Sequence, residues 1–105
     1  MAKKSRDKGL RIEREVVNRH KDIGVVARRV PLSGAAEGYP GDVIIADHFT
    51  GEVKARKAGF KSIIDWLGDN DILFLRPDGD TPYVFMPWET YIQLIALWGK
   101  QVDQP

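Results

Sequence analysis

Residues 39–54, YPGDVIIADHFTGEVK, decide the fold, because they read as two strands joined by a tight turn. A Pro-Gly pair precedes an apolar, β-branched run, which predicts a strand over 42–46. A short polar turn ends at Gly51, where we expect a positive φ, and a second strand follows over 52–56. The stretch therefore predicts an antiparallel hairpin, and the rest of the chain can be interpreted as its support.

Two carboxylates and a lysine lie on this hairpin. Glu52 and Lys54 are two residues apart, so on a strand they project from one face. Asp42 shares that face only if the loop has an odd number of residues or the hairpin contains a bulge, and we predict one of these. Such a surface would be an oxygen-rich cation site beside a proton donor or acceptor, which is typical of phosphodiester cleavage.

Length and composition indicate a single globular domain, residues 1–105, with a basic tail over 1–4. The chain is 43% hydrophobic and 30% charged, and no apolar run approaches the ~20 residues that a membrane span needs. The first residues contain no apolar signal segment, so we expect a cytoplasmic protein. The chain has no cysteine, so a metal would need oxygen ligands or the two histidines. We interpret His20 as a residue at the edge of the core and His48 as a turn residue.

Charge is unevenly distributed along the chain. Residues 1–61 contain 14 Lys and Arg against 8 Asp and Glu, a net charge of +6, whereas residues 62–105 contain 2 against 7, a net charge of −5. A basic half of this kind suits a polyanionic partner. A solvated charged helix explains the same composition, and charge alone does not choose between them.

The first helix is predicted over residues 5–22, with Gly24 as its stop. At about 100° per residue, Glu13 falls inside the apolar arc and Glu15 lies on the opposite, arginine-rich side. A carboxylate on a face that packs against the core is unfavourable unless a charged or hydrogen-bonding group receives it. Glu13 is therefore a candidate functional residue, and Glu15 is interpreted as a surface partner of arginines.

The remaining pattern predicts an α/β fold, a mixed sheet flanked by helices, in the order α-β-β-β-α-β-β-α. The other expected elements are a strand over 24–30, a loop over 32–40, a helix that follows 57–61 and ends at Gly68, strands over 71–76 and 83–86, and a helix over 87–98 that stops at Gly99. The last helix is apolar nearly all round, so it either packs across the sheet or faces another subunit.

Five motifs in this order resemble the PD-(D/E)xK nucleases. They are KGLRIEREVV (8–17), RR (28–29), SG (33–34), GDVI (41–44) and GEVK (51–54). The nearest branch is the archaeal-type Holliday-junction resolvases with their small phage relatives, and the resemblance covers roughly residues 5–60. It implies a restriction-endonuclease-like core.

The resemblance implies roles for individual residues. Asp42 and Glu52 would bind Mg²⁺ or Mn²⁺ with the carbonyl of Val53, and Glu13 would complete the shell directly or through water. Lys54 would position or deprotonate the attacking water, and Ser33 would touch the scissile phosphate. The residues expected to contact DNA are Lys3, Lys4, Arg6, Lys8, Arg11, Arg28, Arg29, Arg56, Lys57 and Lys61.

The expected function is a metal-dependent DNA endonuclease of phage or prophage origin that resolves four-way junctions by paired symmetric nicks. It would act as a homodimer without a nucleotide cofactor, since symmetric cuts need two sites related by a two-fold axis. Two alternatives remain open. One is a nuclease of the same kind acting on flaps, nicks or a specific duplex site, and the other is a non-cleaving DNA-binding module of the same fold.

Overall fold

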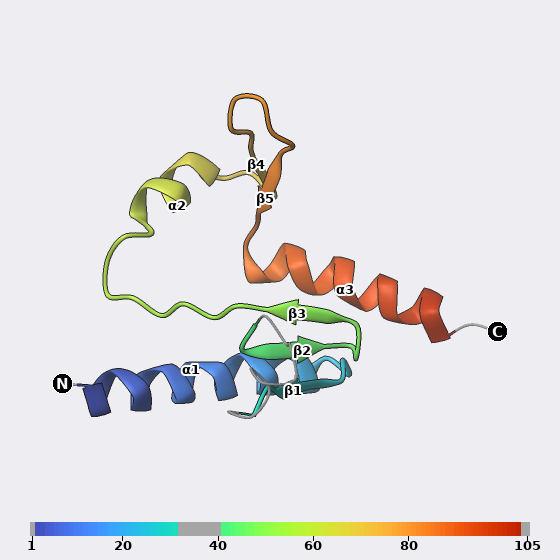
Figure 1. The fold of residues 1–105 in the computed structure, drawn as a ribbon. Helices are drawn as coiled ribbons and strands as arrows, with labels where there is room; N and C mark the ends of the chain where they lie inside the picture. Colours follow the sequence, from blue (N-terminus) through green and yellow to red (C-terminus); the bar gives the residue numbers. More distant parts are fainter. Residues whose placement is uncertain (1, 32–40, 104–105) are drawn as a thin grey trace. The chain divides into compact units, whose positions relative to one another are not determined.

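A computed structural model of the chain describes residues 2–31 and 41–103, with the side chains of 7–31 and 41–99. It shows a small α+β protein whose elements follow the predicted order α-β-β-β-α-β-β-α (Figure 1). The chain forms two compact units, Met1–Ala55 and Arg56–Pro105, called here the N-terminal unit and the C-terminal unit. In the described part of the chain, no helix has the length and apolar character that crossing a membrane requires.

The N-terminal unit begins with helix α1, Ala2–Asp22, which contacts the first two strands of a three-stranded sheet. The helix ends in a Schellman motif: the N–H of Val25 donates to the carbonyl of His20 at 2.9 Å, and that of Gly24 to Lys21 at 3.0 Å. Gly24 has a φ of 79°, which a residue with a Cβ adopts only at a cost, so the predicted stop is confirmed. The predicted start at Ser5 is wrong by three residues, because residues 2–4 are helical.

The sheet of this unit contains β1 (Ala27–Arg29), β2 (Val43–Ile45) and β3 (Phe49–Gly51), all antiparallel, with β2 in the middle. All three residues of β2 are buried, as expected for a central apolar strand covered by a helix. The core that α1 and the sheet enclose consists of Val17, Val25, Ala27, Val43, Ile44 and Ile45.

The turn between β2 and β3 differs from the prediction. Ala46 and Asp47 have positive φ of 56° and 52°, and the N–H of His48 donates to the carbonyl of Ile45 at 3.1 Å, as in a type I′ turn. Gly51 does not supply the turn, and β3 ends there, so the strand predicted over 52–56 is placed too late in the sequence. The preference of glycine for positive φ favoured Gly51 as the turn residue, but Ala46 and Asp47 adopt the left-handed conformation instead.

The C-terminal unit contains α2 (Lys61–Leu67), a hairpin of β4 (Leu73–Leu75) with β5 (Tyr83–Phe85), and α3 (Trp88–Asp103). Gly68 caps α2 with a φ of 57°, which confirms the predicted stop. Helix α3 continues past Gly99, so the predicted end is wrong. Burial raises the pKa of the Tyr91 phenol, whose ring lies 5.2 Å from the ring of Trp88.

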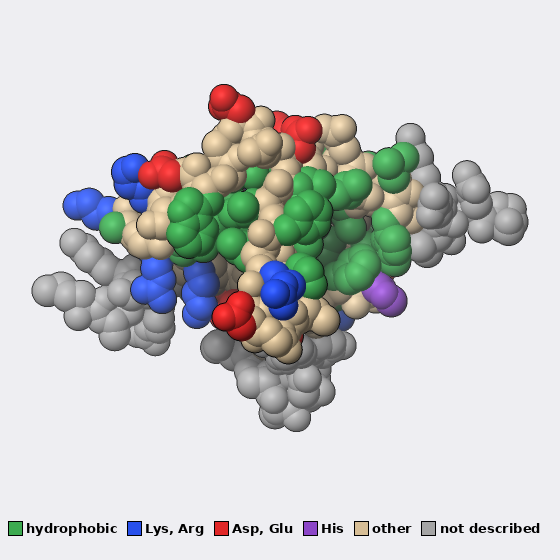
Figure 2. All heavy atoms as spheres, turned by 90° about the horizontal axis from the view of Figure 1, so that it is seen from above, with side chains coloured by type: hydrophobic (Ala, Val, Ile, Leu, Met, Phe, Trp, Pro, Cys, Tyr) green, Lys and Arg blue, Asp and Glu red, His purple; other side chains and the backbone are tan. Residues whose placement is uncertain are grey.

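The two sheets are separate, so the single mixed sheet predicted from the sequence is wrong: strands β4 and β5 pair only with each other in the described part of the chain. Hydrophobic side chains lie at the surface of the face drawn in Figure 2. In the C-terminal unit the exposed large hydrophobic residues are Phe60, Ile64, Trp66, Phe74, Tyr83, Val84, Leu94 and Leu97.

Candidate functional site

The register of the β2–β3 hairpin determines how Asp42 and Glu52 relate. Val43 lies opposite Gly51 and Ile45 opposite Phe49, so three residues connect the last pair. This odd-length connection confirms the predicted condition on the loop. The pairing ends with Val43 opposite Gly51, and beyond it the N–H of Asp42 bonds to the carbonyl of Gly51 rather than to Glu52, so the regular register does not continue.

Asp42 is held by the chain that faces it. Its Oδ2 accepts a hydrogen bond from the N–H of Val53 at 2.8 Å, and its own N–H donates to the carbonyl of Gly51 at 2.8 Å. The neighbouring Gly41 packs so closely that a Cβ there would lie 2.5 Å from the oxygen of Gly51. Gly41 therefore helps to fix the Asp42 carboxylate at the end of β2, because only glycine permits this approach.

Glu52 and Lys54 lie side by side beyond the end of β3. The Nζ of Lys54 is 3.3 Å from the Oε1 of Glu52, and the two side chains are 60% and 51% exposed. The predicted proximity of the two residues is confirmed, although the strand that was expected to create it is not formed here. An exposed pair of this kind contributes little to stability, so both groups can serve a ligand without much loss.

Glu13 faces inward, as its position in the apolar arc predicted, and it forms an ion pair with Arg29 of β1. The Nε of Arg29 donates to the Oε1 of Glu13 at 3.2 Å, with the side chains 31% and 19% exposed. This ion pair joins α1 to β1 and satisfies a half-buried carboxylate. Glu15 pairs instead with Arg19 on the exposed side of the helix, as expected.

The three carboxylates have suitable chemistry for a divalent cation, since Mg²⁺ and Mn²⁺ prefer oxygen ligands. Their arrangement does not form a metal site: within the described residues, no three His, Cys, Asp or Glu side chains gather closely enough to hold an ion. Glu13 is bound to Arg29, Asp42 to the Val53 N–H, and Glu52 to Lys54. The carboxylate oxygens are suitable ligands for such a cation, but in the described residues they are not gathered around one position.

The remaining predicted site residues are spread over the molecule. Ser33 lies outside the described residues, and Lys3, Lys4 and Arg6 lie in α1 without described side chains. The exposed basic residues of the predicted set are Arg11, Arg28, Arg56, Lys57 and Lys61, while Lys8 and Arg29 are half-buried. Lys61 pairs with Asp65 at 2.6 Å on α2.

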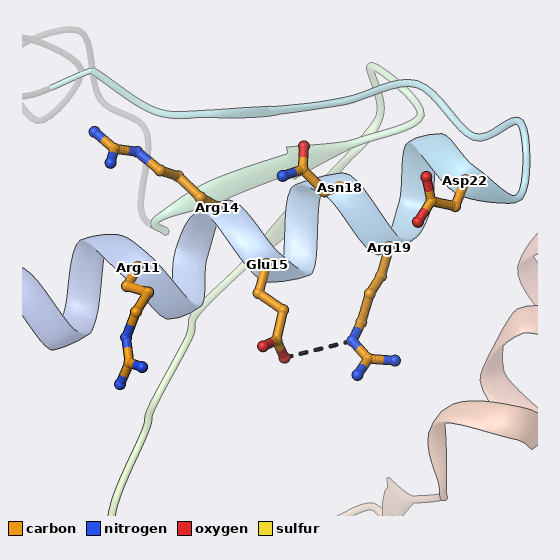
Figure 3. A pocket seen from close by; sticks show the side chains of 6 residues that line it. All are labelled: Arg11, Arg14, Glu15, Asn18, Arg19 and Asp22. Carbon is orange, nitrogen blue, oxygen red and sulfur yellow. Dashed lines mark hydrogen bonds and ion pairs between the residues drawn. The ribbon is translucent and has the colours of Figure 1, made fainter.

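The sequence interpretation missed part of the polar face of α1. A hollow on this face is lined by Arg11, Arg14, Glu15, Asn18, Arg19 and Asp22 (Figure 3). Of these, only Arg11 was predicted to contact a ligand. Positions 11, 15, 18 and 22 follow one another at intervals of three or four residues, which was the available signal for one continuous helix face.

Both histidines have structural positions, as predicted. His20 is buried, and its Nδ1 lies 2.7 Å from the carbonyl of Val16; because a carbonyl only accepts, Nδ1 carries the proton. His48 follows the turn and its ring meets that of Phe49 edge to face at 4.6 Å.

Comparison of the chain with protein-family models, with curated proteins and with solved structures found no match.

Proposed function

We propose that the chain is a metal-dependent DNA endonuclease that resolves four-way junctions as a homodimer. The observation that carries the proposal is that Asp42 is hydrogen-bonded to Gly51 and Val53, the two neighbours of Glu52 in the chain, while Glu52 contacts Lys54. This proximity supports the interpretation of GDVI and GEVK as parts of one site. The basic composition of residues 1–61 supports a polyanionic substrate.

Within this proposal, Asp42 and Glu52 would provide the carboxylates for Mg²⁺ or Mn²⁺ and the carbonyl of Val53 a third oxygen, and binding of the ion would have to draw these groups together. Lys54 carries an exposed positive charge beside Glu52, where it can offset negative charge on a phosphate and orient water. Glu13 can take part only after it leaves Arg29. Ser33 keeps its proposed contact with the scissile phosphate.

Cleavage assays with three labelled DNAs test the proposal: a synthetic four-way junction, a flap and a linear duplex, each with Mg²⁺. Paired, symmetric nicks on the junction alone support the proposed activity. Cutting of the flap or the duplex would replace junction resolution by the broader nuclease function. Absence of any cutting, with DNA binding intact, would contradict both nuclease functions.

The substitution Asp42→Asn separates catalysis from folding, because an Asn carbonyl oxygen can still accept the hydrogen bond from Val53. We expect the cleavage rate to fall by about a hundredfold or more, the scale seen when one electrostatic contact to a transition state is lost. Junction binding should remain. Asp47→Asn is the matched control, since Asp47 is exposed in the turn and Asn tolerates the same positive φ. Cleavage by Asp42→Asn at the rate of the control would disprove the metal assignment.

A non-cleaving DNA-binding module is the second candidate function. The observation in its favour is that Glu13, Asp42 and Glu52 all have partners within the protein. A binding module has no need of free carboxylates. Metal titration monitored by the NMR signals of residues 42 and 52 distinguishes the two, because only the nuclease predicts shifts at both residues with Mg²⁺ or Mn²⁺.

A further inference from the structure

Helix α1 is asymmetric in charge along its length. Residues 2–14 contain six Lys and Arg against two Asp and Glu, whereas residues 15–22 contain two of each. One of the two acidic residues in the first part, Glu13, is turned inward and neutralised by Arg29. The basic excess of the helix therefore lies in its first part.

Arg11 and Arg14 are the described arginines of this first part, and both are exposed. Figure 3 shows them at one end of the hollow on α1, with Asn18 farther along the helix and Asp22 at the other end. Among the side chains described, neither Arg11 nor Arg14 forms an ion pair, whereas Arg19 is engaged by Glu15 at 3.4 Å. Among the described side chains, these two guanidinium groups are therefore exposed without an ion-pair partner, although Glu15 and Asp22 line the same hollow.

The arginines on β1 offer a weaker alternative. Arg29 already binds Glu13, and its side chain is 31% exposed. Moving it to a phosphate would leave the half-buried Glu13 carboxylate without its partner, which carries a desolvation cost. Arg11 and Arg14 can bind a phosphate without such a loss, because within the described residues they have no ion-pair partner to give up.

We infer that the exposed face of α1 binds the DNA phosphate backbone through Arg11 and Arg14, with the Asn18 amide as a neutral donor at its edge. The inference rests on the proposed function, since it takes DNA as the substrate. Residues 11–18 extend over about 10 Å of helix, which corresponds to roughly three phosphates along one strand. Arginine suits this role because its planar fork donates two parallel hydrogen bonds to a phosphate. Contacts of this kind recognise the backbone and its shape rather than base sequence.

The test measures binding of a fluorescent four-way junction over a series of salt concentrations, without divalent metal, so that cleavage does not interfere. The double substitution Arg11→Gln with Arg14→Gln should weaken binding by about tenfold or more and lower the slope of log affinity against log salt by about 2, one unit per lost phosphate contact. Glu15→Gln should strengthen binding, because it removes a negative charge from the same face of α1. A gain of affinity cannot result from misfolding.

Arg76→Gln is the matched control, because Arg76 is an exposed arginine of the C-terminal unit, where it donates to the carbonyl of Pro77. It should leave affinity and salt slope unchanged. Unchanged binding by the Arg11/Arg14 variant, or an equal loss with Arg76→Gln, would overturn the assigned face while the proposed nuclease stands. A wild-type chain that binds no DNA would overturn both.

Discussion

The N-terminal and C-terminal units differ in what becomes of their hydrophobic residues. Among the described side chains, six hydrophobic residues of the N-terminal unit are buried, against two of the C-terminal unit, Leu67 and Ile95. Eight of the ten exposed large hydrophobic residues in the described chain belong to the C-terminal unit. The sequence of each unit shows clear apolar periodicity. The apolar periodicity of a sequence therefore predicts which face of a helix or strand is hydrophobic, but not whether another element packs against that face.

The largest expected effect is at the centre of the N-terminal core. Ile45 is 5% exposed on the middle strand, so Ile45→Ala should lower the free energy of unfolding by about 2–5 kcal/mol. The counterpart in the C-terminal unit is Val84→Ala, where a side chain 53% exposed should give a change within about 0.5 kcal/mol. Urea denaturation measures both. Equal losses would show that the two units bury their strands alike.

Glycines provide a second contrast between the units. Gly41→Ala places a Cβ against the Gly51 oxygen and should destabilise the protein by about 1–3 kcal/mol through backbone displacement. Gly99→Ala lies within helix α3 with nothing within 4 Å of the new Cβ, so it should stabilise the protein by about 0.5–1 kcal/mol. Thermal unfolding of the two variants gives shifts of opposite sign. A stable Gly41→Ala variant would mean that the end of β2 does not approach β3 so closely.

The smallest expected changes in the free energy of unfolding come from removing ion pairs. Glu13→Gln leaves the half-buried Arg29 without a charged partner and should cost about 1–2 kcal/mol, less than for a fully buried pair. In the C-terminal unit, Asp65→Asn removes a pair whose side chains are 86% and 57% exposed, and the cost should be about 0.3–0.5 kcal/mol. Glu15→Gln is the control on α1 itself. Urea midpoints that rank Asp65→Asn above Glu13→Gln would contradict the structural role of the α1–β1 pair.

The sequence predicted the order of elements, because that order depends on local periodicity and on stops such as Gly24 and Gly68. The prediction was wrong at positions where the conformational preference of a single residue, such as glycine, did not decide the local structure. Glycine propensity placed the turn at Gly51, whereas Ala46 and Asp47 form it. Gly99 was expected to end α3, but one glycine costs a helix only about 1 kcal/mol, and α3 continues. Pairing between distant strands has no local signal, so two sheets were predicted as one.

The candidate site was predictable to the same extent. The inward position of Glu13 and the proximity of Glu52 to Lys54 followed from spacing alone. The partner of Glu13 did not, since Arg29 lies sixteen residues away and meets it only through tertiary packing. Arg14 and Asn18 were not predicted as binding residues, because the apolar periodicity of the first helix identifies only the side that faces the core. Both residues lie on the opposite, polar side, where charged residues were interpreted as solvent-exposed.

The turn at Ala46 and Asp47 also bears on the order of events during folding. A left-handed backbone costs a residue with a side chain roughly 1–2 kcal/mol, which Asp bears better than Ala. A hairpin with this turn gains little on its own, so it should not form first. We expect the transition state to contain α1 packed on β1 and β2, with the turn closing afterwards. A φ-value near 1 at Ala46 would contradict this sequence of events.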